Sequence, residues 1–542
     1  MTVAHLRARR WHHSAILTGW YRVPGLLAAL MCAMSVFGCT RAEPRGSDVF
    51  AATLDADPET FDPGMMSGSV EGKVAYQLFE GLLSPASGDG PPEPGGASSW
   101  TVSDDGLVWT FQLRPDARWS NGDPVVAEDF RYAWLRILRG DVAAEYISFV
   151  RLVRNGRRFE AGEVDEQQVG IRTNGVHELI VELEESVPYF AEILPFYTFF
   201  PVHRGSIEAH GQEGAFRPEN LVTNGAFRMR EYRRRNRVHL ERNPNYWGVD
   251  SVALREVYLE IIEDLSANVS AFRDGRVDWT DHLPHNQLRT LQAMPEFRTG
   301  DMLGVYYFRL NTTAPPLDDV RVRRALSLAL NREELCRCTL DALYAPTTGF
   351  VPPIPGYTGA ASVRFAPDEA RELLADAGFP SGDGLPVLQL LFNTSENHRV
   401  IAESVQDMWQ RELGIRVELV NQEWKVYLDS MRELDYQVAR SAWIGDYADP
   451  NTFLEIWRTG DENNRTGWSD PTFDQLVNQA MAQAPQERLV TLRRAEEILL
   501  EQMPVVPVYT YAQFHLVSER VRGWELNARD VHLLRRIRLE GP

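Results

Sequence analysis

Two opposite charges stand close together late in the chain and could hold a ligand between them. Arg440 and Asp446 are six positions apart, and the residues between them (serine, alanine, tryptophan, isoleucine and glycine) carry no charge. If this stretch is an extended strand, the two side chains lie about 20 Å apart. A guanidinium group binds carboxylates and a carboxylate binds ammonium groups, so the spacing suits a ligand charged at both ends, such as a peptide zwitterion. The same residues also fit an ordinary strand end with two solvated charges.

The motifs of the common enzyme classes are absent from the sequence. It has no GxSxG, no Walker loop, no HExxH, and no GxGxxG between a strand and a helix. Ser67 is a conceivable nucleophile, but the sequence identifies no base that would activate it. Cys336 and Cys338 have the wrong spacing for a zinc knuckle or a thioredoxin-type pair, and we expect them to pack in a helix core. The absence of these motifs does not exclude an enzyme but makes one less expected, and nothing in the sequence requires a metal, nucleotide or other cofactor.

The first 39 residues differ in composition from the rest. They contain four arginines and no acid, and an apolar run over residues 23–38 ends at Cys39. This pattern predicts an export signal, and its end resembles a bacterial lipobox, in which the cysteine becomes a lipid anchor. The alternative is an ordinary signal with a leftover cysteine. Removing the four arginines changes the net charge from -20 to -24, and so acidic a protein is not expected to bind nucleic acid.

The clearest predicted elements lie between residues 365 and 420. Apolar spacing and a following glycine predict a helix from Pro367 to about residue 377, a strand over 387–392, a second helix that includes Ile401 to Trp409 and stops at Gly414, and a strand over 415–419. Strand, helix and strand joined by short connections predict a βαβ unit. A strand over 257–262 followed by a helix over 265–273 repeats the α/β pattern. The Pro/Gly/Ser-rich residues 85–99 are expected to form a long loop before a strand over 109–113 and a helix over 129–138.

Several motifs in the same order along the chain resemble one protein family. From about residue 55 to 517 the chain is similar to the family 5 extracellular solute-binding proteins. The motifs that carry the resemblance are Asp57-Pro58-Glu59-Thr60-Phe61-Asp62-Pro63, Gln77-Leu78-Phe79-Glu80-Gly81, Arg118-Trp119-Ser120-Asn121-Gly122-Asp123-Pro124, Val222-Thr223-Asn224-Gly225, Asn243-Pro244-Asn245-Tyr246-Trp247, Asp318-Asp319-Val320-Arg321 and Asn421-Gln422-Glu423-Trp424-Lys425.

The resemblance implies an α/β fold of the type II periplasmic-binding-protein kind, in which two lobes close over a hinged cleft and a third lobe enlarges one of them. After the signal at residues 1–39, the expected lobes are lobe I (47–79, 204–303 and 514–542), lobe II (80–203) and lobe III (304–513). The resemblance further implies an extracytoplasmic, lipid-anchored monomer that captures short oligopeptides for an ABC importer. Its partners would be the permease and ATPase subunits, and it would touch the membrane only through Cys39.

The resemblance also assigns roles to single residues. Asp446 matches the aspartate that pairs with the peptide ammonium, and Arg440 and His398 match groups near the peptide carboxylate. The strand residues Ala442, Trp443 and Ile444 would hydrogen-bond the ligand backbone. The remaining expected cleft residues are Trp424 and Tyr146, as walls of side-chain pockets, and Tyr509 and Tyr511, on a strand bordering the cleft.

Some positions depart from the family pattern. Ser67 and Arg309 replace acidic cleft residues, so we expect less tolerance for basic ligand side chains and more for acidic ones or for an early carboxylate. A disulfide found within the family aligns with Gly304 and Ile444, so that crosslink is absent. Other ligands remain open for the same fold, namely dipeptides, a nickel chelate, haem or a sugar. A peptide receptor or chaperone that is not coupled to import remains open as well.

Overall fold

The computed structural model describes residues 46–541, apart from the side chain of Glu396. The predicted export signal and the anchor Cys39 lie outside the described residues. Within residues 46–541, no helix is both long enough and apolar enough to span a membrane.

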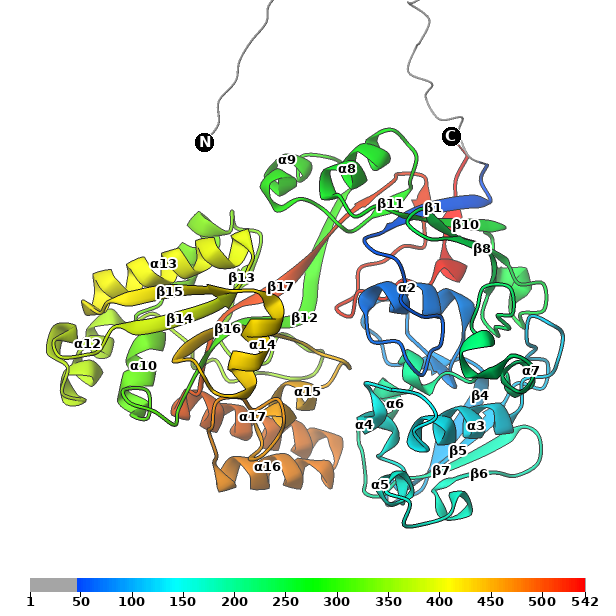
Figure 1. Ribbon diagram of the computed structural model, residues 1–542, viewed down its shortest axis with the longest axis horizontal. Coiled ribbons are helices and arrows are strands. Elements are labelled where there is room, and N and C mark those ends of the chain that lie inside the picture. The colour runs from blue at the N-terminus through cyan, green and yellow to red at the C-terminus, as the bar shows by residue number, and fades with distance from the viewer. Residues whose placement is uncertain (1–45, 542) are drawn as a thin grey trace, which may run out of the picture. The chain divides into compact units, whose positions relative to one another are not determined.

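The largest sheet has eleven strands and runs in the order β15-β14-β16-β12-β17-β11-β1-β10-β9-β8, with β13 pairing beside β17. Figure 1 shows its two longest strands, β12 and β17, side by side between the group of β14, β15 and β16 and the group of β1, β8 and β10. The strands are β1 (Val49–Leu54), β8 (Phe227–Arg233), β9 (Arg237–Arg242), β10 (Glu256–Ile261), β11 (Trp279–Thr280), β12 (Phe297–Leu310), β13 (Ala345–Pro346), β14 (Leu388–Asn393), β15 (Val417–Gln422), β16 (Val438–Ile444) and β17 (Val505–Val517).

The predicted βαβ unit is confirmed. β14 and β15 pair in parallel, and helix α13 (Glu396–Leu413) connects them. The helix buries Ile401, Val405 and Trp409 on one side, and the Trp409 Nε1–H donates to the Leu326 carbonyl (2.9 Å). Gly414 ends the helix with a φ of 70°, a conformation that glycine adopts at little cost. The predicted helix over 265–273 is α8 (Leu265–Arg273), whose first turn is capped by the Asp264 carboxylate.

A separate four-stranded sheet lies within residues 80–203, in the order β4-β5-β7-β6. The predicted loop over 85–99 is wrong in its second half, because β3 (Glu93–Pro94) begins inside it and β4 (Ala97–Val102) pairs with β5 (Val108–Leu113). Small and polar residues resemble a loop in the sequence, but here their backbone gains hydrogen bonds from the neighbouring strand. The other strands are β2 (Leu83–Ser84), β6 (Ile171–Thr173), β7 (Glu178–Glu182), β18 (Val521–Arg522) and β19 (Arg538–Leu539).

Helices cover both sheets and complete the buried clusters. Among them, α12 (Pro367–Asp376) begins at the proline from which it was predicted, and Cys336 is buried while Cys338 is exposed in a π-helical turn, Leu335–Thr339. The remaining helices are α2 (Ser69–Leu78), α3 (Ala127–Leu138), α4 (Ile147–Val150), α5 (Gly156–Glu160), α6 (Phe190–Ile193), α7 (Arg204–Gly214), α9 (Leu288–Leu291), α10 (Val320–Leu328), α11 (Arg332–Glu334), α14 (Trp424–Arg432), α15 (Asn451–Leu454), α16 (Pro471–Met481) and α17 (Pro485–Gln502).

A buried ion pair ties the segment after β1 to helix α3. The Arg136 Nη1–H donates to the Asp62 Oδ1 (3.0 Å), its Nη2–H donates to the other carboxylate oxygen, and its Nε–H donates to the Gln212 Oε1 (2.6 Å). Both charged side chains are buried. A buried pair is favourable only when its remaining donors and acceptors are also satisfied, and the forked geometry together with Gln212 meets that condition.

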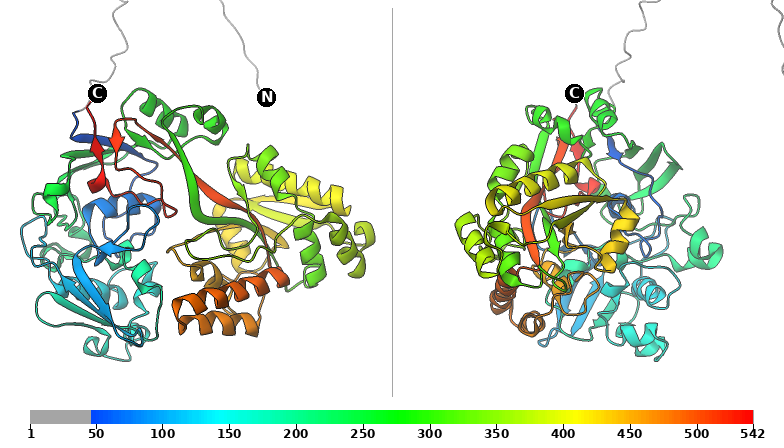
Figure 2. Two further views of the ribbon diagram at one scale, coloured as in Figure 1. Left: turned by 180° about the vertical axis from the view of Figure 1, so that it is seen from behind. Right: turned by 60° about the vertical axis from the view of Figure 1, so that its left-hand side comes forward.

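The pairing of β12 with β17 is interrupted in its middle. Asp301 pairs with Ala512 and Val305 with Thr510, so the register shifts between these positions. At the interruption, the Leu303 N–H donates to the Ala528 carbonyl (2.7 Å) of the C-terminal segment. The left view of Figure 2 shows these two strands continuing between the two groups of elements. A break in the hydrogen-bonded ladder is where two long strands bend most easily.

Gly304 and Ile444 lie directly opposite each other on β12 and β16. A Cβ at Gly304 would lie 2.5 Å from the Cδ1 of Ile444, so the isoleucine already occupies the space that a side chain at 304 would need. Packing of Ile444 against the glycine thus holds the strands together where the crosslink is absent.

We predict that the double variant Gly304→Cys with Ile444→Cys forms a disulfide in mild oxidant. Opposed Cα atoms of antiparallel strands are about 4.5–5.5 Å apart, which is within the range that a disulfide spans. Thiol titration and mass measurement of the unfolded protein give the number of thiols lost, and Gly304→Cys alone serves as the control. Full retention of both new thiols after oxidation would contradict the register.

Candidate ligand-binding site

Asp446 stands two residues after the end of β16, at the wall of a cavity of about 230 Å³. Gly445 allows this placement because a Cβ there would lie 2.8 Å from the Leu303 side chain, while its N–H donates to the Leu303 carbonyl (2.8 Å). Among the described residues, none gives the Asp446 carboxylate a hydrogen bond or an ion pair. Burial raises its pKa to about 6. A cation that reached this carboxylate would compensate for the lost hydration.

The residue after Asp446 is firmly anchored. Tyr447 is buried, its ring stacks on Tyr189 with the centroids 4.4 Å apart, and its hydroxyl donates to the Glu455 carboxylate (2.8 Å). Tyr189 belongs to the segment 80–203, so the stack joins this segment to the one that carries Asp446. The position of Asp446 is therefore set by packing on both sides of it.

Aromatic rings line the same cavity. Tyr146 packs edge-on against Phe196, with the centroids 4.6 Å apart, and lies 6.2 Å from Tyr197. Burial and, to a smaller extent, the nearby Asp446 carboxylate raise the pKa of Tyr146 to about 12. Of the residues predicted from the sequence, the structure brings Asp446, Tyr146, Ser67 and Ile444 together here.

Arg440 belongs to a second cluster. It lies on β16 with its guanidinium 5.0 Å from the Tyr306 ring centroid, and its Nη groups donate to the Asn393 Oδ1 (3.3 Å) and the Tyr511 hydroxyl (3.2 Å). The Tyr509 ring stacks on Tyr306 at 4.8 Å, and the His398 ring lies 5.7 Å from Tyr306. Burial and the Arg440 charge lower the pKa of His398 to about 3, so this imidazole is neutral at physiological pH. This second cluster contains Arg440, His398, Tyr509 and Tyr511. None of these four residues lines the Asp446 cavity.

Strand β16 connects the two clusters and has one open edge. Its residues 438–444 pair with β12 on one side, whereas β14 pairs on the other side only at Val438 and Ala439. Among the described strands, none pairs with that second edge over residues 440–444. The backbone of Ala442, Trp443 and Ile444 therefore presents donors and acceptors along a free edge. Such an edge can receive an extended peptide as an added strand.

Trp424 does not line the Asp446 cavity. It is 49% exposed at the start of α14 and stacks on Tyr427 at 5.6 Å, and the Tyr427 hydroxyl donates to the Arg440 carbonyl. It therefore stands beside the Arg440 end of the open edge, where an exposed ring is available to a ligand side chain.

Arg309 lies on the face of the sheet opposite to Arg440. It pairs in register with Ala439, whereas Arg440 pairs with Phe308, and neighbouring strand residues point to opposite faces. The Arg309 side chain is buried, donates to the Ser441 Oγ (3.1 Å) and the Tyr307 hydroxyl (3.0 Å), and lies 5.0 Å from the Trp457 ring centroid. The expected reversal of charge in the cleft therefore does not come from Arg309.

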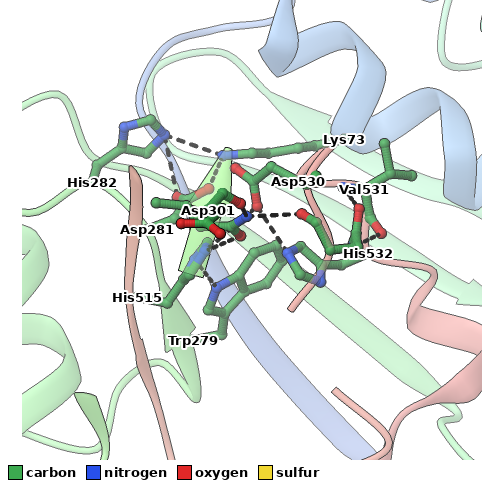
Figure 3. A network of polar contacts seen from close by, with 12 residues as sticks. Lys73, Trp279, Asp281, His282, Asp301, His515, Asp530, Val531 and His532 are labelled. Carbon is green, nitrogen blue, oxygen red and sulfur yellow. Dashed lines mark hydrogen bonds and ion pairs between the residues drawn. The ribbon is translucent and has the colours of Figure 1, made fainter. Parts of the chain in front are cut away.

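The C-terminal segment forms a further wall that sequence reasoning missed. Lys73, Trp279, Arg529, Asp530 and His532 line the cavity, and Figure 3 shows all of them except Arg529 within one polar network. Lys73 forms an ion pair with Asp281. Burial acts to lower the pKa of Lys73, but the carboxylates of Asp281, Asp530 and Asp55 together raise it. Sequence periodicity gave no signal for Arg529, Asp530 and His532, because the C-terminal segment that carries them is irregular.

His515, Asp530 and His532 lie close enough to resemble a metal site. The hydrogen bonds around His515, however, already occupy both nitrogens of its ring. The Gln513 amide nitrogen donates to the carbonyls of Asp301 and Asn527 (2.8 Å each), so its oxygen must accept from the His515 Nε2–H (2.9 Å), and the Trp279 Nε1–H donates to the His515 Nδ1 (3.3 Å). Both ring nitrogens of His515 are thus engaged, and its pKa is lowered by burial to about 4. We assign the cluster to the support of the cavity wall.

Comparison with known proteins identifies the family. The sequence profile of the bacterial extracellular solute-binding proteins, family 5 Middle, matches residues 91–465. The oligopeptide-binding protein OppA of Bacillus subtilis is 33% identical over 497 residues, covering 89% of this chain and 91% of the relative.

Two solved structures share the fold. Haemophilus influenzae OppA in complex with the peptide RPPGFSPFR has a TM-score of 0.76 and 31% identity, covering 92% of this chain and 100% of the other. The murein tripeptide binding protein MppA of Escherichia coli has a TM-score of 0.77 and 32% identity, covering 92% and 99%. The predicted type II periplasmic-binding fold is confirmed. The chain belongs to the family 5 bacterial extracellular solute-binding proteins, which bind solutes outside the cytoplasm.

Proposed function

We propose that this chain is the substrate-binding component of an ABC importer and captures short oligopeptides. The observation that carries the proposal is the open edge of β16, with the Arg440 cluster at one end and the unpaired Asp446 carboxylate just beyond the other. An extended peptide would add to this edge through its backbone, with its ammonium at Asp446 and its carboxylate toward Arg440. Backbone hydrogen bonds do not depend on the peptide sequence, so many peptides would be accepted.

The relatives support the peptide class of ligand. Oligopeptide-binding proteins and a murein peptide-binding protein are among them, and the Haemophilus influenzae structure was solved with a peptide. The relatives also include a dipeptide-binding protein of Bacillus subtilis and a probable deoxycholate-binding periplasmic protein of Escherichia coli, each 30% identical to this chain. Dipeptides or another small solute, such as a nickel chelate, haem or a sugar, therefore form the second candidate class.

Binding would close the cleft about the interrupted pairing of β12 and β17. We propose that the chain has the three predicted lobes and that lobes I and III move relative to each other as β12 and β17 bend. A ligand that contacts Asp446 on one side and the residues of α2 and the C-terminal segment on the other gains more contacts when the cleft closes. The population therefore shifts toward the closed form.

The other parts of the proposal concern partners and chemistry. The closed monomer would deliver its peptide to permease and ATPase subunits, and Cys39 would anchor it outside the cytoplasmic membrane. No reaction is proposed, because the matched family and the relatives named above are binding proteins.

Isothermal titration tests the function directly. The mature chain is unfolded, washed free of carried ligand, refolded, and titrated with defined tripeptides to pentapeptides. We expect saturable binding of several sequences that share only a free amino terminus. Binding of dipeptides alone, or no heat with any peptide, would reject the oligopeptide proposal and favour the second class of ligands.

Peptide binding should weaken in acid. Asp446 has a pKa of about 6 in the unliganded protein, and a bound ammonium would lower it, so binding requires the carboxyl to lose its proton. At pH 5 about nine-tenths of such carboxyls are protonated, and we expect Kd to be roughly tenfold higher than at pH 7.5. Titrations from pH 5 to 7.5 measure this dependence. A flat wild-type profile over that range would contradict the role of Asp446.

A further inference from the structure

Arg529 contributes an unpaired positive charge to the cavity that contains Asp446. Among the described residues, none forms an ion pair or a hydrogen bond with its guanidinium. The other cation of that wall, Lys73, forms an ion pair with Asp281, and the Asp530 carboxylate lies 2.8 Å from the His532 Nε2. Arg529 is therefore the cation of this wall that is left for a ligand.

The loop that carries Arg529 is held in place by its neighbours. The Asn527 side chain donates to the Val531 carbonyl (3.0 Å) and accepts from the Val531 N–H (3.1 Å), which clamps the turn across Arg529. Asp530 has a φ of 54°, a conformation that a residue other than glycine adopts only when its surroundings require it. On the far side, Gln77 of α2 bonds the His532 carbonyl (3.1 Å) and the Leu534 N–H (2.9 Å). The guanidinium is thus presented from a fixed backbone.

Besides Asp530, the carboxylates of Glu192 and Asp446 line the cavity with Arg529, and neither forms an ion pair with it. Glu192 of lobe II lines the cavity without an ion pair to Arg529 within 4.0 Å. Burial raises the pKa of Glu192, and the charge of Arg529 offsets this only in part. Asp446 is not paired with Arg529 either, since its pKa is governed by burial alone. A ligand with an ammonium at Asp446 therefore has room for an anionic group at Arg529.

We propose that Arg529 makes this protein selective for peptides that carry a carboxylate close to their amino terminus, namely an acidic side chain on the first or second residue. The inference rests on the proposed capture of peptides through Asp446. A guanidinium in a partly dehydrated cavity binds a carboxylate through charge-assisted hydrogen bonds and leaves a neutral amide of the same shape less strongly held.

Matched peptides test the selectivity by isothermal titration. The pairs are Glu-Ala-Ala with Gln-Ala-Ala and Ala-Glu-Ala with Ala-Gln-Ala, and trialanine with its carboxamide tests whether the terminal carboxylate reaches Arg529 instead. We expect wild type to prefer the glutamate peptide of at least one pair by roughly tenfold. Arg529→Met should reduce that ratio to near one, Arg529→Lys should retain much of it, and the exposed control Arg494→Met should leave it unchanged.

The outcomes separate this inference from the proposed function. Binding of all peptides with equal affinity for glutamate and glutamine forms would overturn the inference while supporting peptide capture. A preference that survives in Arg529→Met, or one that appears only between trialanine and its amide, would also overturn it. Absence of binding by every peptide would reject the proposed function itself. Melting temperatures of the unliganded variants establish that each one is folded.

Discussion

Replacing Asp446 with asparagine should weaken peptide binding by at least about 100-fold, because the ligand ammonium loses its counter-charge in a site shielded from water. Asparagine keeps the shape of the side chain, so the packing of Tyr447 against Tyr189 beside it is retained. Titration with a tripeptide measures the loss. The exposed Asp407 serves as the control, and Asp407→Asn should bind as wild type does. Loss of less than about tenfold in Asp446→Asn would contradict the assigned role.

The same substitution should stabilise the unliganded protein. The pKa of Asp446 is raised from 3.8 to about 6 in the folded chain, so the folded state resists ionisation and loses stability as the pH rises from about 4 through 6. Asparagine removes this penalty, and the unfolding free energy at pH 7 should rise by about 1–3 kcal/mol. The gain should disappear at pH 3, where the carboxyl is protonated in both states. Urea unfolding at the two pH values measures it, and a destabilised variant at pH 7 would contradict the account.

Of the single substitutions proposed, Glu496→Ala should cause the largest loss in unfolding free energy, because Glu496 of α17 holds the segment 350–360. The Glu496 carboxylate is fully buried and accepts from the N–H groups of Phe350 (2.8 Å), Val351 (2.9 Å) and Ala360 (2.8 Å) and from the Tyr357 hydroxyl (2.7 Å). Removing it leaves four buried donors without an acceptor. Each orphaned group costs about 1–3 kcal/mol, so we expect a loss of at least 4 kcal/mol in unfolding free energy.

The neighbouring residue provides the control for this effect. Glu497 is partly exposed, and its ion pairs among the described residues are with Arg493 and Arg494 on the surface of the helix, so Glu497→Ala should change stability by less than about 0.5 kcal/mol. Calorimetry and urea unfolding compare the two variants. A similar small effect for both would show that the four contacts to Glu496 do not hold the 350–360 segment.

Helices and strands were predicted from the sequence where one face of the element is buried, because burial of one face gives a periodic apolar pattern. The βαβ unit from β14 to β15 and helix α8 show clear apolar spacing and clear ends, so the bounds of α8 agree with the prediction, those of β14 differ by one residue and those of β15 by up to three. β4 was missed because its stability comes from pairing with β5, which the composition of residues 97–102 does not reveal.

The positions of the site residues depend on strand register and on irregular segments, and the sequence pattern reveals neither. Asp446 stood out because it lies six positions after Arg440 and matches the ammonium-binding aspartate of the family, and the structure places it at a cavity. Arg309 was expected at the cleft, but its face is fixed by the pairing of β12 with β16, and a shift of one residue reverses every side chain. Arg529 lies in an irregular segment whose position comes from hydrogen bonds to Asn527 and Gln77, so no periodic pattern could indicate it.

The most direct measurement of the central claim is a binding cycle with two proteins and two ligands, wild type and Asp446→Asn, each titrated with trialanine and N-acetyl-trialanine. Acetylation removes the ammonium from the ligand as the substitution removes the carboxylate from the protein. The account predicts that either change alone weakens binding by at least about 100-fold. The two changes together should weaken binding no more than one of them alone, because both delete the same interaction. Equal affinity of wild type for the free and the acetylated peptide would contradict it.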